Sequence, residues 1–153
     1  MSRIQRRVRR PSCKATTLQW QEQTKETTVF DNAFSGFSVD DVEVARKFYG
    51  ETLELQVTDE GMGIIALRVG GGSKVIVYPK PDHVPATFTI LNFEVDDIDK
   101  AADLLAERGV TFAKYEGMGQ DAKGIARGTQ TGQGPDIAWF TDPAGNVLSI
   151  LHG

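Results

Sequence analysis

The sequence predicts an α+β protein built from two βαβββ modules in tandem, with a cleft between two curved mixed sheets. Three observations carry this prediction: a repeated corner motif, an apolar helical stripe after each copy, and strand-like segments after each stripe. The motif FSVDDV at 37–42 returns as FEVDDI at 93–98, 56 positions later. Such an offset is typical of a half-domain, and two similar halves packed together create a cleft where function is sought.

Each copy of the motif reads as the end of a strand and the start of a helix. Alternation places Phe37 and Val39 on one face of the first strand, because side chains alternate along a strand. Asp41 and Asp97 then follow as helix N-caps, since a carboxylate accepts hydrogen bonds from the free N–H groups of the first turn.

Apolar residues recur at helical spacing after both caps and predict that each helix packs one stripe against a sheet. The stripes are Val42, Ala45, Phe48 and Tyr49 in the first copy, and Ile98, Ala101, Leu104 and Leu105 in the second. Gly50 and Gly109 are the expected stops, because glycine readily takes the left-handed conformation that ends many helices.

Three strands are expected after each helix. In the first module, 33–79, they cover about 55–58, 64–69 and 75–78, with a glycine turn at 70–72. In the second module, 87–152, they cover about 111–115, 137–141 and 147–151, with a turn at 142–146. Residues 80–86 form the linker, and 116–135 is expected to be a long irregular segment.

These features together resemble the vicinal oxygen chelate superfamily. The resemblance rests on the βαβββ repeat, the Val-x-Asp corner with Phe48 and Tyr49 at its helix end, and the closing DPAGN turn at 142–146. It covers roughly residues 30 to 152. The superfamily includes glyoxalase I, extradiol dioxygenases, fosfomycin-resistance enzymes and bleomycin-resistance binding proteins, so the fold is implied while the activity stays open.

Catalytic members of this superfamily hold a divalent ion with His or Glu side chains on the first and last strands of each module. Seven positions before each helix cap, this chain has Phe34 and Ile90. The counterparts on the last strands are Ile76 and Ser149. Phenylalanine and isoleucine offer no lone pair, and a serine hydroxyl is a poor sole ligand. We therefore expect no metal and no other cofactor.

Other metal ligands are scarce in the sequence. The chain has two histidines, His83 and His152, and one cysteine, Cys13, with no spacing that prearranges ligands. We expect both histidines to be solvated, one in the linker and one near the chain end.

Hydrocarbon side chains at the positions where the superfamily has its metal ligands predict an apolar pocket for an apolar or aromatic small molecule. Candidate ligand-binding residues are Phe34, Ile76, Tyr78, Ile90, Tyr115, Trp139 and Ser149. Because neighbours alternate, only one of Trp139 and Phe140 can face the cleft. The alternative is that the apolar residues among them simply fill the core.

The segment 116–135 supplies charged candidates. Lys123 and Arg127 are expected to receive an anionic ligand group, and Glu116, Asp121 and Asp136 are candidate acids or bases if buried. Surface solvation is the alternative for each of these charges.

Composition favours a soluble domain with a sizeable core and no membrane span, since 40% of 153 residues are apolar and none form a long apolar run. A lone cysteine is compatible with the cytoplasm. Residues 31–153 carry ten Lys or Arg against nineteen Asp or Glu, so nucleic acid is not an expected partner. Residues 1–29 are basic, and three interpretations stay open: a disordered arm, a targeting peptide or sequence from an upstream start codon.

Two functions of different classes follow. The first is a metal-free binding protein of the bleomycin-resistance type, holding an apolar or aromatic molecule in the inter-module cleft. The alternative is a glyoxalase-, isomerase- or dioxygenase-like enzyme that uses carboxylates or an unconventional metal site. The resemblance also implies a homodimer.

Overall fold

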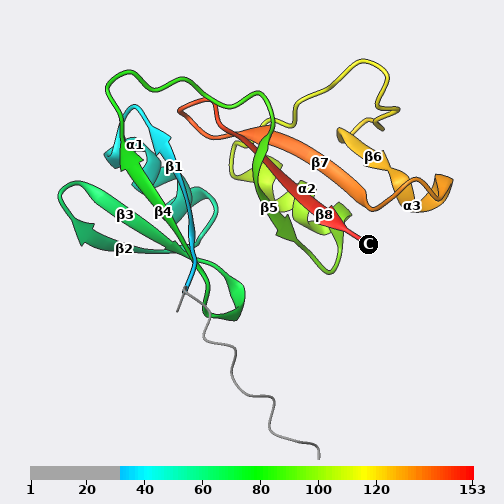
Figure 1. The fold of residues 1–153 in the computed structure, drawn as a ribbon. Helices are drawn as coiled ribbons and strands as arrows, with labels where there is room; N and C mark the ends of the chain where they lie inside the picture. The colour runs from blue at the N-terminus through cyan, green and yellow to red at the C-terminus, as the bar shows by residue number, and fades with distance from the viewer. Residues whose placement is uncertain (1–31) are drawn as a thin grey trace, which may run out of the picture. The chain divides into compact units, whose positions relative to one another are not determined.

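The computed structural model describes residues 32–153, so the basic segment 1–29 lies outside the described residues. Each module forms its own four-stranded mixed sheet, in the order β1-β4-β3-β2 and β5-β8-β7-β6 (Figure 1). In both sheets the first strand pairs parallel with the last, and the other pairs are antiparallel. The tandem βαβββ fold is thereby confirmed.

The first module comprises β1 (Ser35–Val39), α1 (Val42–Lys47), the π-helical turn η1 (Phe48–Thr52), β2 (Gln56–Gly61), β3 (Ile64–Arg68), the 3₁₀ turn η2 (Gly70–Gly72) and β4 (Lys74–Pro79). The second comprises β5 (Thr89–Glu94), α2 (Ile98–Glu107), β6 (Ile125–Arg127), α3 (Gly128–Thr131), β7 (Asp136–Thr141) and β8 (Val147–His152). No helix among the described residues is long and apolar enough to cross a bilayer.

Both predicted corners form as the motif indicates. Asp41 accepts hydrogen bonds from the N–H groups of Glu43 and Val44, and Asp97 accepts one from Lys100. The predicted stop at Gly109 is confirmed by its positive φ of 90°, one residue after Arg108, the C-cap of α2. The stop at Gly50 is wrong, because η1 continues the helical path to Thr52.

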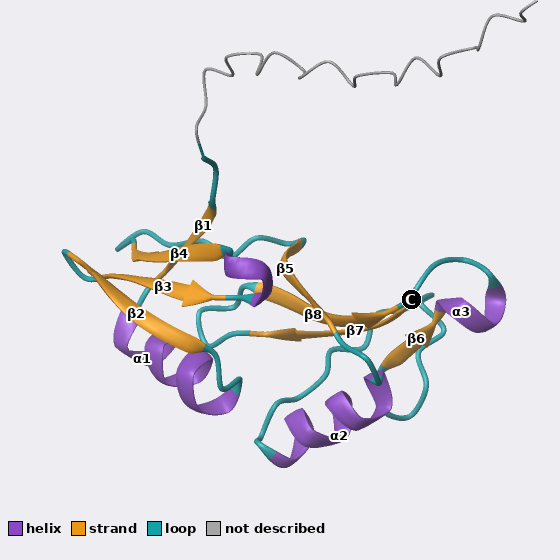
Figure 2. Ribbon diagram, turned by 90° about the horizontal axis from the view of Figure 1, so that it is seen from below, coloured by secondary structure: helices purple, strands orange, loops and turns teal. Residues whose placement is uncertain are grey.

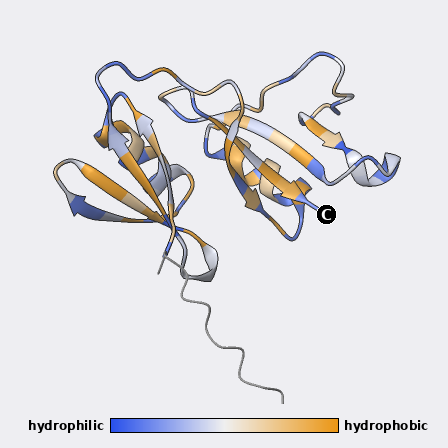
Figure 3. Ribbon diagram, in the orientation of Figure 1, coloured by the Kyte–Doolittle hydropathy of each residue, from blue (hydrophilic) through white to orange (hydrophobic). Residues whose placement is uncertain are grey.

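One face of each sheet is buried against its helix and the other is free of helices. Figure 2 shows α1 and α2 on the same side of the strands, and in Figure 3 the hydrophobic colouring follows the strands of both sheets. Alternation decides which side chains are covered: Phe140 is 1% exposed in the core, whereas its neighbour Trp139 faces the helix-free side.

The second module departs from the prediction between its helix and β7. The strand expected at 111–115 is absent there, and only an isolated bridge joins Ala113 to Trp139. The segment expected to be irregular contains β6 and α3 instead. Ile125 and Ala126 of β6 are buried, so a three-residue strand within a glycine-rich segment completes the sheet.

Candidate functional site

The four positions that hold a metal in the superfamily lie on β1, β4, β5 and β8 or next to them. Phe34 is 61% exposed just before β1, and the Lys74 ammonium lies 5.2 Å from the centre of its ring. Ile76 and Ile90 are half-buried. Ser149 is fully buried on β8, and its hydroxyl donates a hydrogen bond of 2.6 Å to Asn92 Oδ1 on the neighbouring strand β5.

This set does not fit a divalent ion. Three of the four side chains are hydrocarbon, and the neutral hydroxyl of Ser149 is a poor sole ligand for a divalent ion. Within residues 32–153, no group of three or more His, Cys, Asp and Glu side chains is arranged to hold a metal.

A cleft of about 380 Å³ lies between the two modules, and we call it the inter-module cleft. Its walls come from β1, from the end of β4, from the start of β5 and from the segment that connects β4 to β5. The lining residues include Ser35, Gly36, Phe37, Ser38, Tyr78, Val84, Ala86, Phe88, Thr89, Ile90 and Asn146. Of the predicted binding residues, Tyr78 and Ile90 are brought together here.

Three apolar side chains are exposed at the edge of this cleft, beside polar lining residues such as Ser35, Thr89 and Asn146. Val84 is 81% exposed, Phe88 is 69% exposed and Tyr78 is 39% exposed. Contiguous exposed apolar side chains of this kind mark binding sites more often than single ones do. Val84 and Phe88 were missed by the sequence reasoning, which treated the linker only as a connection.

A buried hydrogen-bond network that shares Ser38 and Asn146 with the cleft ties the modules together, and we call it the inter-module bridge. Tyr49 at the end of α1 donates to Asp142 Oδ2 at 2.7 Å. Asp142 also accepts from the backbone N–H and the side-chain amide of Asn146. That amide also donates to the Ser38 carbonyl on β1 at 3.0 Å. Burial, and then the Asp142 carboxylate, raise the pKa of Tyr49 far above its usual value, so its proton stays in this bond.

The linker histidine contributes to the same region, contrary to the expectation that it is solvated. His83 is half-buried, with Nε2 3.0 Å from the Ala144 carbonyl and Nδ1 2.8 Å from Ser38 Oγ. A carbonyl only accepts, so Nε2 carries the proton and Nδ1 accepts from the serine in the neutral imidazole. His152 likewise bonds to the Val95 carbonyl through Nδ1 at 2.9 Å.

The charged candidates lie together elsewhere, in a cluster around Arg127. The guanidinium contacts Asp99 at 2.8 Å, Asp121 at 2.7 Å and Asp136 at 3.5 Å. The hydrogen bond from Arg127 lowers the pKa of Asp99 to about 2. The pKa of Asp136 is also lowered, and the largest cause is the hydrogen bond from the Thr129 hydroxyl. For Asp121, burial raises the pKa, but hydrogen bonds from the Ile125 N–H and Arg127 outweigh it.

Lys123 is similarly engaged, with Asp103 at 2.8 Å and Asp99 at 3.5 Å. Glu116 is exposed, and Tyr115 packs edge-on against Trp139 with ring centres 5.7 Å apart. None of these residues lines the inter-module cleft. The structure thus places Lys123, Arg127 and the candidate carboxylates outside the cleft that Tyr78 and Ile90 line.

Comparison with solved structures identifies the fold. A glyoxalase family protein from Bacillus anthracis matches with 18% identity and a TM-score of 0.58, covering 81% of this chain and 97% of that one. TnmS3, an antibiotic binding protein from Streptomyces sp. CB03234, matches with 22% identity and a TM-score of 0.55, covering 79% and 95%. A superfamily member from Sphaerobacter thermophilus matches with 24% identity and a TM-score of 0.57, covering 80% and 98%.

No curated protein matches this chain. The sequence model of one family, however, matches residues 32–150, which is most of the chain and includes both modules. The protein belongs to the Glyoxalase/Bleomycin resistance protein/Dioxygenase superfamily.

Proposed function

We propose that this protein binds an apolar or aromatic small molecule in the inter-module cleft and holds it without a metal ion. The observation that carries the proposal is the cleft itself, where Tyr78 and Ile90 meet the exposed side chains of Val84 and Phe88. Burying such side chains against a ligand removes apolar surface from water, which is the main driving force of such binding. The antibiotic binding by TnmS3, a protein of the same fold, is consistent with this role.

The walls of the cleft also indicate the polar part of the ligand. β1 and β5 are both edge strands of their sheets, and an edge strand leaves backbone N–H and C=O groups on one side without a sheet partner. A ring system with one or two hydrogen-bonding groups suits such a cleft. The inter-module bridge fixes the Asn146 side chain at its base, so the floor is rigid before a ligand arrives.

Two further features support binding rather than catalysis. The metal positions carry three hydrocarbon side chains and one neutral serine hydroxyl. The candidate acids and bases Glu116, Asp121 and Asp136 lie outside the cleft, and the lowered pKa values of the two aspartates keep them ionised near neutral pH.

A thermal-shift screen of aromatic and drug-like compounds tests the proposal. A compound at 100 times its dissociation constant adds about 2.7 kcal/mol to the free energy of unfolding. Phe88→Ser should weaken a hit by about tenfold or more, because it removes a large apolar contact. Val44→Ser, which changes an exposed apolar residue on α1 outside the cleft, is the matched control. Silence across the library, or equal affinity of both variants, would reject the proposal.

We also propose a cytoplasmic homodimer. Tyr115, in the segment between α2 and β6, is exposed, and a second copy would bury such apolar surface. Light scattering coupled to size-exclusion chromatography should return twice the 16.8 kDa chain mass. A monomer at high micromolar concentration would contradict this.

A further inference from the structure

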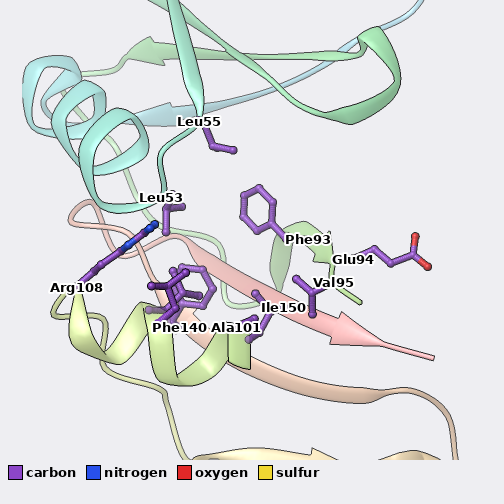
Figure 4. A pocket seen from close by; sticks show the side chains of 11 residues that line it. Leu53, Leu55, Phe93, Glu94, Val95, Ala101, Arg108, Phe140 and Ile150 are labelled. Carbon is purple, nitrogen blue, oxygen red and sulfur yellow. The ribbon is translucent and has the colours of Figure 1, made fainter. Parts of the chain in front are cut away.

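Two cavities of the molecule differ in what their walls offer a ligand. The cavity between α2, the second sheet and the segment after η1 is lined mainly by hydrocarbon side chains (Figure 4). The inter-module cleft instead runs along β1, since four consecutive residues of that strand, 35–38, line it. Within residues 32–153, β1 pairs only with β4 and is the edge of its sheet. An open edge presents backbone groups, which select the chemistry of a ligand more narrowly than an apolar wall does.

The hydrogen bonds at the end of β1 show which backbone groups point to its open edge. The Val39 carbonyl points toward β4, because the N–H of Lys80, directly after β4, donates to it at 2.9 Å. The Ser38 carbonyl points the other way and accepts from the side chain of Asn146 at 3.0 Å. Alternate residues of a strand direct their N–H and C=O groups to the same edge. The N–H of Ser38 and both backbone groups of Gly36 therefore point to the open edge.

Gly36 leaves this edge bare. It is exposed, and in the described part of the chain neither its N–H nor its carbonyl has a hydrogen-bond partner. Phe37 and Val39 are buried on the helix side, so alternation places Gly36 on the helix-free face, opposite Ile76 of β4. A Cβ built on Gly36 would lie 3.4 Å from the Ile76 Cβ, so the missing side chain uncovers Ile76. An aromatic side chain on an adjacent strand can cover such an edge glycine.

The surroundings of Gly36 limit the length of a ligand that pairs with it. At one end, the Ser38 carbonyl is already bound by Asn146, whose amide is also held by Asp142. Pairing along the edge therefore stops at this point. The cleft encloses about 380 Å³, and Val84 and Phe88 of the linker expose apolar surface at its rim. These features favour a short extended molecule with an apolar side group over a long strand.

We propose that the ligand of the inter-module cleft is a short peptide-like molecule with an aromatic residue that pairs with Gly36. The N–H of that residue donates to the Gly36 carbonyl, and its carbonyl accepts from the Gly36 N–H, as in an antiparallel pair. Its ring lies over Gly36 and against Ile76. This inference rests on the proposed function and adds an amide backbone to the aromatic ligand.

Three capped tripeptides test the assignment: acetyl-Ala-Phe-Ala-amide, the same peptide methylated on the Phe nitrogen, and acetyl-Ala-Ala-Ala-amide. Each is titrated into isotopically labelled protein and followed by NMR. The first should shift the Gly36 amide signal saturably and slow its exchange with deuterium, because that N–H gains an acceptor. Methylation removes the donor to the Gly36 carbonyl, and the all-alanine peptide lacks the ring. Each change should weaken binding by about tenfold.

Variants separate the ring contact from the backbone pairing. Gly36→Ala places a methyl group where the ring lies and should abolish the preference for the Phe peptide over the all-alanine peptide. Gly50→Ala is the matched control, because its new Cβ lies outside the cleft and 3.5 Å from Val57, an ordinary contact. Ile76→Thr gives the same test while keeping a β-branched residue on β4, and it should weaken the Phe peptide alone.

Three results would overturn the assignment: no shift of the Gly36 amide at millimolar peptide, equal affinity of the Phe peptide and its methylated form, or a Phe preference that survives Gly36→Ala. Compounds from the thermal-shift screen are titrated into the same labelled protein. If they shift Val84 and Phe88 while the peptides leave Gly36 unmoved, this inference fails and the proposed function stands. If neither kind of probe shifts a cleft residue, the proposed function fails as well.

Discussion

The two modules repeat one corner motif and then use the end of the helix in different ways. In the first, Tyr49 follows α1, is fully buried and bonds to Asp142 of the other module. In the second, the equivalent position 56 residues later is Leu105, which has no hydroxyl and lines an apolar cavity between α2, the second sheet and the segment after η1. At this position the first module therefore has a polar link to the other module, and the second module borders an apolar cavity.

A repeated motif specifies the local element that it forms, but it does not specify what packs against that element. Both caps form because the aspartate and the free N–H groups of the first turn are neighbours in sequence. What covers each helix depends on contacts that are distant in sequence, such as the Tyr49–Asp142 bond across 93 positions. Substitutions in the inter-module bridge, in the helix caps and in the Arg127 cluster separate the contribution of distant contacts from the contribution of local ones.

We expect the largest loss of stability at the inter-module bridge, because its Tyr49 has no counterpart in the second repeat. Asp142→Ala removes the acceptor of three hydrogen bonds and leaves the buried Tyr49 hydroxyl without a partner. We expect a loss of about 3 kcal/mol in the free energy of unfolding, measured in urea. Tyr49→Phe should cost about 1–2 kcal/mol, and Tyr115→Phe, on an exposed ring, should cost almost nothing. A bridge variant as stable as the parent would contradict this account.

The shared caps should give a smaller and graded effect. Asp41 accepts two backbone hydrogen bonds and Asp97 accepts one. Asp41→Ala should therefore cost about 1–2 kcal/mol and Asp97→Ala about 0.5–1 kcal/mol in the same urea assay. The order of the two values is the test, and a larger loss at Asp97 would show that helix length outweighs the number of capping bonds.

The third expected effect is on the pH dependence of stability, at the Arg127 cluster, which only the second module has. Asp99 has a folded pKa of about 2 against an ordinary 3.8. Its lowered pKa stabilises the fold above the unfolded value, and this contribution disappears as the pH falls from about 4 to 2. Arg127→Met should reduce the loss of unfolding free energy between about pH 4 and 2, measured by urea unfolding at a series of pH values.

The matched control in the first module is Arg68→Met, because Glu60 keeps its second partner Lys74. This variant should lose as much unfolding free energy over that pH range as the parent does. An Arg127→Met protein that also matches the parent there would show that the lowered pKa values do not contribute to stability.

Local chemistry made much of the fold predictable. The caps, the Gly109 stop and the alternation that buries Phe140 and turns Trp139 outward all follow from neighbouring residues. Strand β6 was not predictable, because its three residues lack a pattern of their own and depend on pairing with β7.

The site was predictable in smaller part. Tyr78 and Ile90 were identified and do line the inter-module cleft, but Val84 and Phe88 come from a linker without strand or helix periodicity. The signal that could have drawn attention to Phe88 is an aromatic residue directly before a strand that borders an expected cleft. Arg127 appeared free in the sequence because its aspartate partners lie up to 28 positions away.

The central claim is that the inter-module cleft binds its ligand without a metal. Calorimetric titration of a compound from the screen, before and after extensive treatment with EDTA, tests it most directly. We predict one molecule bound per chain, with the same dissociation constant in both samples. A loss of affinity of about tenfold or more after chelation, restored by adding zinc, nickel, manganese or iron, would contradict the claim.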